Sequence, residues 1–236
     1  FEPLFEDSRY ESKTAVTNFE KLRSADRVSA VYVFGGPMSD TLAPLAERAA
    51  VPMFSTEYDV RYTAGRKYVF RFANNAEDYA RALIESLRKH KRRKFAIGKV
   101  ENQYHNTLSD AFLHTLQEGE QGSVMANFLP GEKDFRPVFP KLKAAAPDAL
   151  GVYLSPGMQH AFFKELQSAG LKLPTFGTDT FESRTENSGV EDVVEGALFA
   201  NSVVEESFER RYRTRFKGSA QLVHAALAYE FVKLFG

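Results

Sequence analysis

Residues 28–34 read Val-Ser-Ala-Val-Tyr-Val-Phe, and Gly35-Gly36-Pro37 follows them directly. An apolar run bounded by glycine and proline is typical of a buried strand that ends in a tight turn. The segment after the turn places Leu42, Leu45 and Ala46 at helical spacing. This stretch therefore predicts a strand, a turn and a helix, the repeating element of sheets whose strands are parallel.

Short apolar runs and longer amphipathic segments alternate along the rest of the chain. The apolar runs predict further strands at 51–55, 68–72, 94–100, 123–129, 149–154, 174–177 and 196–200. Helical spacing predicts further helices at 14–22, 76–89, 107–116, 139–146, 158–169, 207–216 and 223–235. Because strands that alternate with helices form parallel sheets, the predicted fold class is α/β.

The composition describes a globular protein without a charge bias. The 236 residues include 31 Lys+Arg and 31 Asp+Glu, and 43% of them are hydrophobic. A nucleic-acid partner is not expected, because such binders normally carry a basic surplus that neutralises phosphates. The basic run Arg88–Lys94 lies at the end of a predicted helix, where cations interact favourably with the helix dipole, so we interpret it as a solvated face.

Several kinds of chemistry lack their usual residues. The chain has no cysteine, which excludes disulfides, thiolate metal sites and a cysteine nucleophile. His105, His114 and His160 are too scattered for a metal site, so neither a metal nor a cofactor is expected. No GxSxG, GxGxxG or GxxxxGK[ST] motif marks a hydrolase, dinucleotide or nucleotide site. An enzyme of the α/β class is nevertheless kept as an alternative, because fold alone does not decide function.

The chain shows no targeting or membrane segment. No apolar run reaches the length that crosses a bilayer. The sequence begins at Phe1 without an initiator methionine, and a removed signal peptide would leave the same trace.

Polar and aromatic residues follow the predicted strands. Ligands of parallel sheets bind outside the carboxyl ends of the strands, so these turns are the candidate site. The turns are Gly35–Thr41, Thr56–Asp59, Glu101–His105, Ser155–Gly157 and Thr178–Thr180.

At these turns the chain resembles the periplasmic solute-binding proteins of the branched-chain amino-acid (Leu/Ile/Val-binding) type, which have the type I fold and serve ABC importers. The resemblance covers nearly the whole chain in order, through many short stretches without a catalytic motif. These stretches are Phe5–Val16, Ala43–Ser55, Tyr68–Arg71, Gly131–Phe135, Leu142–Ala149 and Ala169–Lys172.

The resemblance implies two lobes, each a parallel sheet flanked by helices, with the ligand in the cleft between them. It assigns 1–73 and 201–236 to lobe one and 74–200 to lobe two, with crossings near Phe72–Asn74 and Ala200–Ser202. Relatives carry a strand and a helix before the first residue here and a third crossover after the last. We therefore expect the chain to be truncated at both ends, with lobe one incomplete.

The resemblance also implies a function. It predicts a non-enzymatic receptor that captures an amino acid or a related small polar molecule by hinge closure and delivers it to a membrane ABC permease. The expected location is periplasmic or extracellular, after removal of a signal peptide, and a lipid anchor is one form of attachment. The alternative is a ligand-sensing domain of a signalling or regulatory system with the same fold.

Gly36-Pro-Met-Ser-Asp-Thr41 is the first candidate ligand-binding turn. Free N–H groups at a helix start attract an anion such as a carboxylate, whereas the plainer interpretation is that Ser39 or Asp40 caps the helix. In relatives a hydroxyl of this turn holds the ligand carboxylate, and the resemblance places Asp40 at or near that hydroxyl, beside Ser39 and Thr41. An acidic residue there repels a carboxylate, which argues against an ordinary amino acid.

The second candidate turn, Thr56-Glu-Tyr-Asp59, carries two carboxylates and a phenol. Relatives use small residues and a hydroxyl there to hold the ligand. If Glu57, Tyr58 and Asp59 face the ligand, they favour a cationic or hydroxyl-rich molecule. A solvated acidic loop is the alternative.

The resemblance places four more residues at the ligand. Tyr104 matches a tyrosine of lobe two that covers the ligand, and Asp179 matches the acidic residue that pairs with a ligand ammonium. Ser155 matches a lining position at which relatives often carry a larger side chain. His224 matches an aromatic lining position of lobe one. The alternatives are a core or surface aromatic for Tyr104, a helix cap for Asp179 and simple packing for His224.

Overall fold

The computed structural model describes residues 2–217 and 222–235, and the chain forms two units. Unit 1 comprises Phe1–Asn75 and Ser202–Gly236, and unit 2 comprises Ala76–Asn201. Residues 1, 218–221 and 236, which the resemblance assigns to lobe one, lie outside the described residues. Each unit contains a parallel sheet flanked by helices, which confirms the predicted α/β class.

Unit 1 is built on a sheet of three parallel strands in the order β1-β2-β3. In register, Val31 pairs with Met53 and Met53 pairs with Val69. The elements of unit 1 are α1 (Ser12–Ser24), β1 (Val31–Val33), α2 (Gly36–Ala49), β2 (Met53–Ser55), the 3-10 helix η1 (Val60–Thr63), β3 (Val69–Arg71), α9 (Glu206–Arg215) and α10 (Leu222–Lys233).

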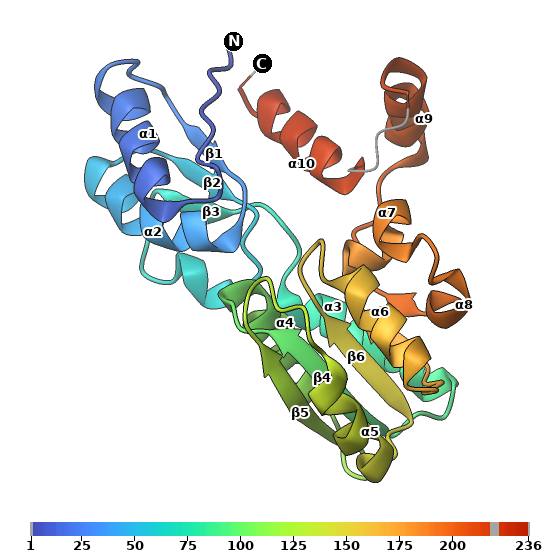
Figure 1. The fold of residues 1–236 in the computed structure, drawn as a ribbon. Helices are drawn as coiled ribbons and strands as arrows, with labels where there is room; N and C mark the ends of the chain where they lie inside the picture. The colour runs from blue at the N-terminus through green and yellow to red at the C-terminus, as the bar shows by residue number, and fades with distance from the viewer. Residues whose placement is uncertain (1, 218–221, 236) are drawn as a thin grey trace. The chain divides into compact units, whose positions relative to one another are not determined.

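Alternate side chains of these strands pack against different helices on the two faces of the sheet. Strand residues two apart point to the same face. Val31 and Met53 are buried in one cluster with Phe19 of α1 and Leu42 of α2. On the opposite face the ring of Phe54 meets that of Phe231 of α10 edge-on, with ring centroids 5.4 Å apart. Figure 1 shows α1 and α2 together beside the sheet.

Unit 2 is built on a five-stranded parallel sheet in the order β5-β4-β6-β7-β8. Its strands are β4 (Lys94–Val100), β5 (Gln121–Phe128), β6 (Ala149–Tyr153), β7 (Thr175–Gly177) and β8 (Leu198–Phe199). Its helices are α3 (Ala76–Lys89), α4 (Gln103–His114), α5 (Phe139–Ala145), α6 (Gln159–Ser168), α7 (Arg184–Asn187) and α8 (Glu191–Val194), with 3-10 helices η2 (Arg136–Val138) and η3 (Asp179–Glu182).

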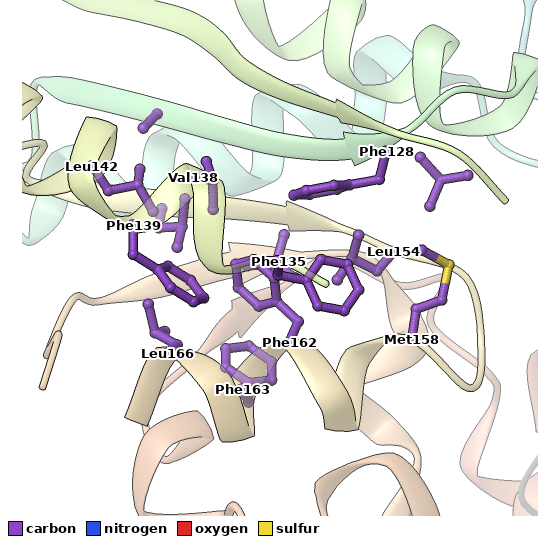
Figure 2. Close-up of a cluster of buried hydrophobic side chains, with 14 of the residues drawn as sticks. Phe128, Phe135, Val138, Phe139, Leu142, Leu154, Met158, Phe162, Phe163 and Leu166 are labelled. Carbon is purple, nitrogen blue, oxygen red and sulfur yellow. The ribbon is translucent and has the colours of Figure 1, made fainter. Parts of the chain in front are cut away.

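Phenylalanines fill both faces of the unit 2 sheet. On one face, residues of α5 and α6 meet the sheet in the cluster shown in Figure 2, where Phe135 and Phe162 lie 5.3 Å apart between ring centroids. On the other face, Phe95 of β4 contacts Phe112 of α4 edge-on at 5.3 Å. The sheet is therefore covered on both sides, as parallel sheets normally are.

The predicted elements differ from the observed ones mainly at their ends. Helix 76–89 and strand 94–100 have the predicted bounds. Helix α4 begins at Gln103 instead of Thr107, because the side chain of Asn102 accepts a hydrogen bond from the backbone N–H of His105. The short helices α7 and α8 were not predicted, since four-residue segments show little periodicity.

The basic run Arg88–Lys94, which begins in the last turn of α3, is bound to the rest of unit 2 through Glu120. The carboxylate of Glu120 has no exposed surface and accepts hydrogen bonds from Arg88 at 2.7 and 2.8 Å and from Arg93 at 3.1 Å. The bonds from Arg88 lower the pKa of Glu120 from 4.5 to about 2. Part of the run thus stabilises unit 2 instead of standing free in solvent.

Glu120→Gln should lower the free energy of unfolding at neutral pH by about 2–3 kcal/mol, because the variant leaves Arg88 and Arg93 without an anion. A depressed carboxyl pKa gives stability that is present above 4.5 and is lost as the pH falls towards 2. The difference between wild type and variant should therefore narrow in acid. Urea denaturation at neutral pH and at about pH 3 measures it, with Glu118→Gln, at an exposed glutamate, as control. A difference that does not change with pH would contradict this account.

Candidate functional site

The carboxyl edge of the unit 2 sheet collects three of the predicted site residues. Strands β4, β6 and β7 are neighbours and parallel, so the residues that follow them lie at one edge. Tyr104 follows β4, Ser155 follows β6 and Asp179 follows β7. The hydroxyl of Tyr104 lies 3.5 Å from Oδ1 of Asp179, at the outer limit of a hydrogen bond. The structure thus brings Tyr104 and Asp179 together.

Tyr104 is positioned by its place in the first turn of α4 and by a buried histidine. Its half-buried ring meets the ring of His105 at 5.0 Å and 61°. Burial, with a smaller effect of the charge on Lys99, lowers the pKa of His105 to about 4, so that this ring is neutral near pH 7. Lys99 is itself buried in β4 and donates a hydrogen bond to Asn106.

Asp179 begins the 3-10 helix η3 but does not cap it, which corrects the alternative that it serves as a helix cap. The cap is Thr178, whose hydroxyl accepts from the backbone N–H of Thr180. Gly177 ends β7 against the neighbouring strand, and a Cβ there would lie 2.2 Å from the carbonyl oxygen of Val152. The carboxylate of Asp179 is therefore left for a role other than capping, on a tightly packed strand end.

A carboxylate of the chain itself occupies the start of helix α6, next to Ser155. Oε1 of the buried Glu186 accepts a hydrogen bond from Gly157 N at 2.5 Å, and Oε2 accepts one from His160 N at 3.2 Å. Ser155 is half-buried, and its carbonyl accepts from Met158 N. Three N–H groups at this helix start, those of Gly157, Met158 and His160, are thus engaged within the fold.

In unit 1 the turn after β1 is held by backbone geometry and not by a side-chain cap. The N-cap of α2 is Gly35, with φ 96°, and no side chain caps the helix, so the interpretation of Ser39 or Asp40 as the cap is wrong. The backbone N–H of Gly35 donates to the hydroxyl of Thr56 at 3.2 Å. The ring of Tyr10 lies against Gly35, where a Cβ would be 2.6 Å from it.

The hydroxyls of this turn are committed to the fold. Ser39 is fully buried and donates to the carbonyl of Gly35 at 2.9 Å. Tyr62 donates to the carbonyl of Ser39 at 3.2 Å. Thr41 donates to the carbonyl of Pro37 at 2.8 Å. These bonds fix the first turns of α2. Asp40 is the acidic residue of this turn.

Glu57 is buried at the end of β2, so the solvated-loop interpretation is wrong for this residue. Only 2% of it is exposed. Its Oε1 accepts hydrogen bonds from the backbone N–H groups of Tyr58 and Asp59 at 2.8 and 3.1 Å. Its Oε2 has no hydrogen-bond partner among the described residues, and a Cβ on Gly36 would lie 3.1 Å from it. This oxygen therefore points at the start of α2.

The other two residues of the acidic turn have different surroundings. Asp59 accepts from Arg61 N at 2.8 Å and forms a two-pronged ion pair with the guanidinium of Arg61. Tyr58 is half-buried. Within this turn, only Glu57 thus has a buried carboxylate oxygen without a hydrogen-bond partner among the described residues.

The carboxyl groups of this region titrate differently. Burial raises the pKa of Glu57, against the effect of its two backbone hydrogen bonds. Burial also raises the pKa of Asp40, and the negative charge of Asp59 adds to this. The bond from the side chain of Arg61 lowers the pKa of Asp59. Burial raises the pKa of Tyr62 to about 12, so this phenol is neutral.

His224 lies on α10 against the strand end of β1. Its ring meets that of Phe34 edge-on, with centroids 4.8 Å apart. Phe34 is 52% exposed and directly precedes Gly35. His224 thus contacts the residue that directly precedes the turn at the start of α2.

Sequence reasoning did not single out several residues that shape the two edges. Tyr10 and Glu186 reach the helix starts from distant segments, and nothing local in the sequence indicates this. Thr56 belongs to a quoted turn, and a hydroxyl beside a predicted strand end was its available signal. Lys99 could have been noticed as a charge inside an otherwise apolar strand.

No helix among the described residues is both long and apolar enough to span a membrane.

The chain belongs to a known family. A family model described as periplasmic binding protein matches residues 1–236, which confirms the resemblance inferred from the turns. The family is periplasmic or extracellular, and membership supports a solute-binding role for this chain. No curated protein matches the sequence significantly.

Solved structures with the same fold include several binding proteins of transporters. The leucine-binding protein LivK of Thermotoga maritima has a TM-score of 0.83 and 20% identity over 97% of this chain and 69% of its own. LivJ of Streptococcus pneumoniae, solved with isoleucine, has 0.80 and 19% over 99% and 70%. A solute-binding protein of Rhodopseudomonas palustris, solved with 3,4-dihydroxybenzoic acid, has 0.77 and 18% over 99% and 68%. At this identity the likeness shows the shared fold.

The opposite pKa shifts of Glu57 and Asp59 predict opposite pH dependences of stability. A raised carboxyl pKa means that the native state binds the proton more tightly, so Glu57 costs stability progressively as the pH rises above 4.5. The depressed pKa of Asp59 gives stability that is present above 3.8 and lost as the pH falls below it. Relative to wild type, Glu57→Gln should therefore become more stable with rising pH, and Asp59→Asn less stable. Urea denaturation of the ligand-free protein from about pH 3 to 7 tests both signs. Parallel curves for wild type and Glu57→Gln would contradict the burial of an ionisable carboxyl there.

Proposed function

We propose that this protein is a receptor that captures an amino acid or a related small polar solute and delivers it to a membrane ABC permease. Unit 1 and unit 2 act in this proposal as the two lobes that enclose the ligand, and the location is the periplasm or the cell exterior. The proposal is supported most by one observation, the meeting of Tyr104 and Asp179 at the carboxyl edge of the unit 2 sheet.

The chemistry of this pair suits a ligand that carries a positive charge. A carboxylate at a partly desolvated site requires a cation or hydrogen-bond donors, and an ammonium group supplies both. The half-buried ring of Tyr104 offers a flat apolar face with one polar tip, which can cover the carbon skeleton of a small solute. In this role Asp179 holds the charged end of the ligand and Tyr104 shields it from water.

A thermal-shift screen tests the receptor function directly. A ligand that binds the folded state alone raises the melting temperature. The panel contains amino acids, polyamines, amides, short carboxylates and sugars. A clear shift with one class is expected and would identify the solute class. A well-folded protein whose melting temperature no compound raises would contradict the receptor function.

Substitutions at the Tyr104–Asp179 pair test the site. Asp179→Asn and Tyr104→Ala should each weaken binding of the solute found in the screen by about 1–3 kcal/mol, because a charge-assisted contact is lost in the first variant and the aromatic cover in the second. Isothermal titration calorimetry measures the change. Asp192→Asn, at an exposed aspartate of α8, is the matched control and should bind like wild type. Unchanged affinity in both site variants would place the ligand elsewhere.

A further inference from the structure

A carboxyl oxygen of the chain already faces the start of helix α2 in unit 1. The first N–H groups of a helix and its dipole attract anions. Oε2 of Glu57 would lie 3.1 Å from a Cβ on Gly36, the first residue of this helix. A second, free carboxylate at the same helix start would therefore meet the charge of Glu57.

The Oε2 oxygen of Glu57 has no hydrogen-bond partner within the described part of the chain, although only 2% of the residue is exposed to solvent. Buried carboxylate oxygens are normally paired, and an unpaired one is costly. The neighbouring cations are engaged elsewhere. Arg61 pairs with Asp59, and Arg66 donates to the carbonyl of Tyr62 with its guanidinium 5.6 Å from the tyrosine ring.

The surroundings of Glu57 add negative and not positive character. The charges of Asp40 and Asp59 both act on Glu57, and each raises its pKa further. The hydroxyls of Ser39 and Thr41 donate to the backbone carbonyls of Gly35 and Pro37 at the start of α2. Unit 1 thus presents an acceptor that requires a donor, at a helix start that would otherwise suit an anion.

We infer that Glu57 selects ligands that present a nitrogen donor, such as an ammonium, guanidinium or amide N–H, to the start of helix α2, and that it rejects ligands that present a carboxylate there. The inference rests on the proposed receptor function and narrows its solute class to amines and amides. Glu57 Oε2 accepts the hydrogen bond from the ligand, while Oε1 stays on the backbone N–H groups of Tyr58 and Asp59.

Pairs of compounds that differ at one carboxylate give the sharpest test. Agmatine is arginine without its carboxylate, putrescine is ornithine without it, and leucinamide replaces it by an amide. At neutral pH at least one of the three carboxylate-free compounds should raise the melting temperature and bind in calorimetry. Its carboxylate partner should bind at least about tenfold more weakly, as expected for a like charge brought next to a buried carboxylate.

Glu57→Gln distinguishes the role of the charge from the shape of the site. Glutamine keeps an oxygen for the N–H groups of Tyr58 and Asp59, so the turn should fold, which circular dichroism checks. The variant should bind the carboxylate-free compound at least about tenfold more weakly and discriminate less within the pair. Glu47→Gln is the control, because the half-buried Glu47 also accepts hydrogen bonds from two backbone N–H groups in unit 1, those of Lys67 and Tyr68. This control should bind like wild type.

The outcomes separate this inference from the receptor function. Binding of the carboxylate members at least as tight as that of their partners would overturn the inference and leave the receptor function standing. Unchanged discrimination in Glu57→Gln would do the same. If none of the pairs binds but the broad screen finds a sugar or a carboxylate, the inference again fails alone. If the screen finds another amine or amide, Glu57→Gln is tested with that compound. If no compound binds in either set, both proposals fail.

Discussion

Parallel pairing of the strands is the constraint on which the rest of this structure depends. The carboxyl ends of all strands in a parallel sheet lie at one edge, together with the turns that follow them. Residues that are distant in sequence meet there, such as Tyr104 and Asp179, which are 75 positions apart. In the smaller sheet the same geometry brings the N–H of Gly35 to the hydroxyl of Thr56. In each unit, the carboxyl edge of the sheet therefore brings together polar groups from segments that are distant in sequence.

Much of the fold could be predicted because periodicity survives wherever an element buries a continuous face. Helix α3 and strand β4 are long and strongly patterned, and their predicted and observed bounds agree. The start of α4 could not be placed, since it depends on one capping contact of Asn102. Helix α7 contains Glu186, whose carboxylate binds the start of α6, and no local pattern announces such a distant contact.

The candidate site was predictable where a residue directly follows a strand. Asp179 and Tyr104 were placed in this way, and the observed sheet order brings them together. The state of Glu57 could not be predicted, because acidic turns are usually solvated. Its burial depends on the tertiary approach of its turn to Gly36, which only the folded chain reveals. The hydroxyl of Ser39 instead donates locally, to the carbonyl of the N-cap Gly35 four residues earlier.

The neutral ring of His105 makes the support beneath Tyr104 insensitive to mild acid. An ordinary histidine changes its charge between about pH 5 and 8, and its contacts change with it. His105 takes up a proton only near pH 4, so its packing against Tyr104 stays the same through that interval. A tyrosine that rests on such a ring keeps its orientation when the medium acidifies moderately.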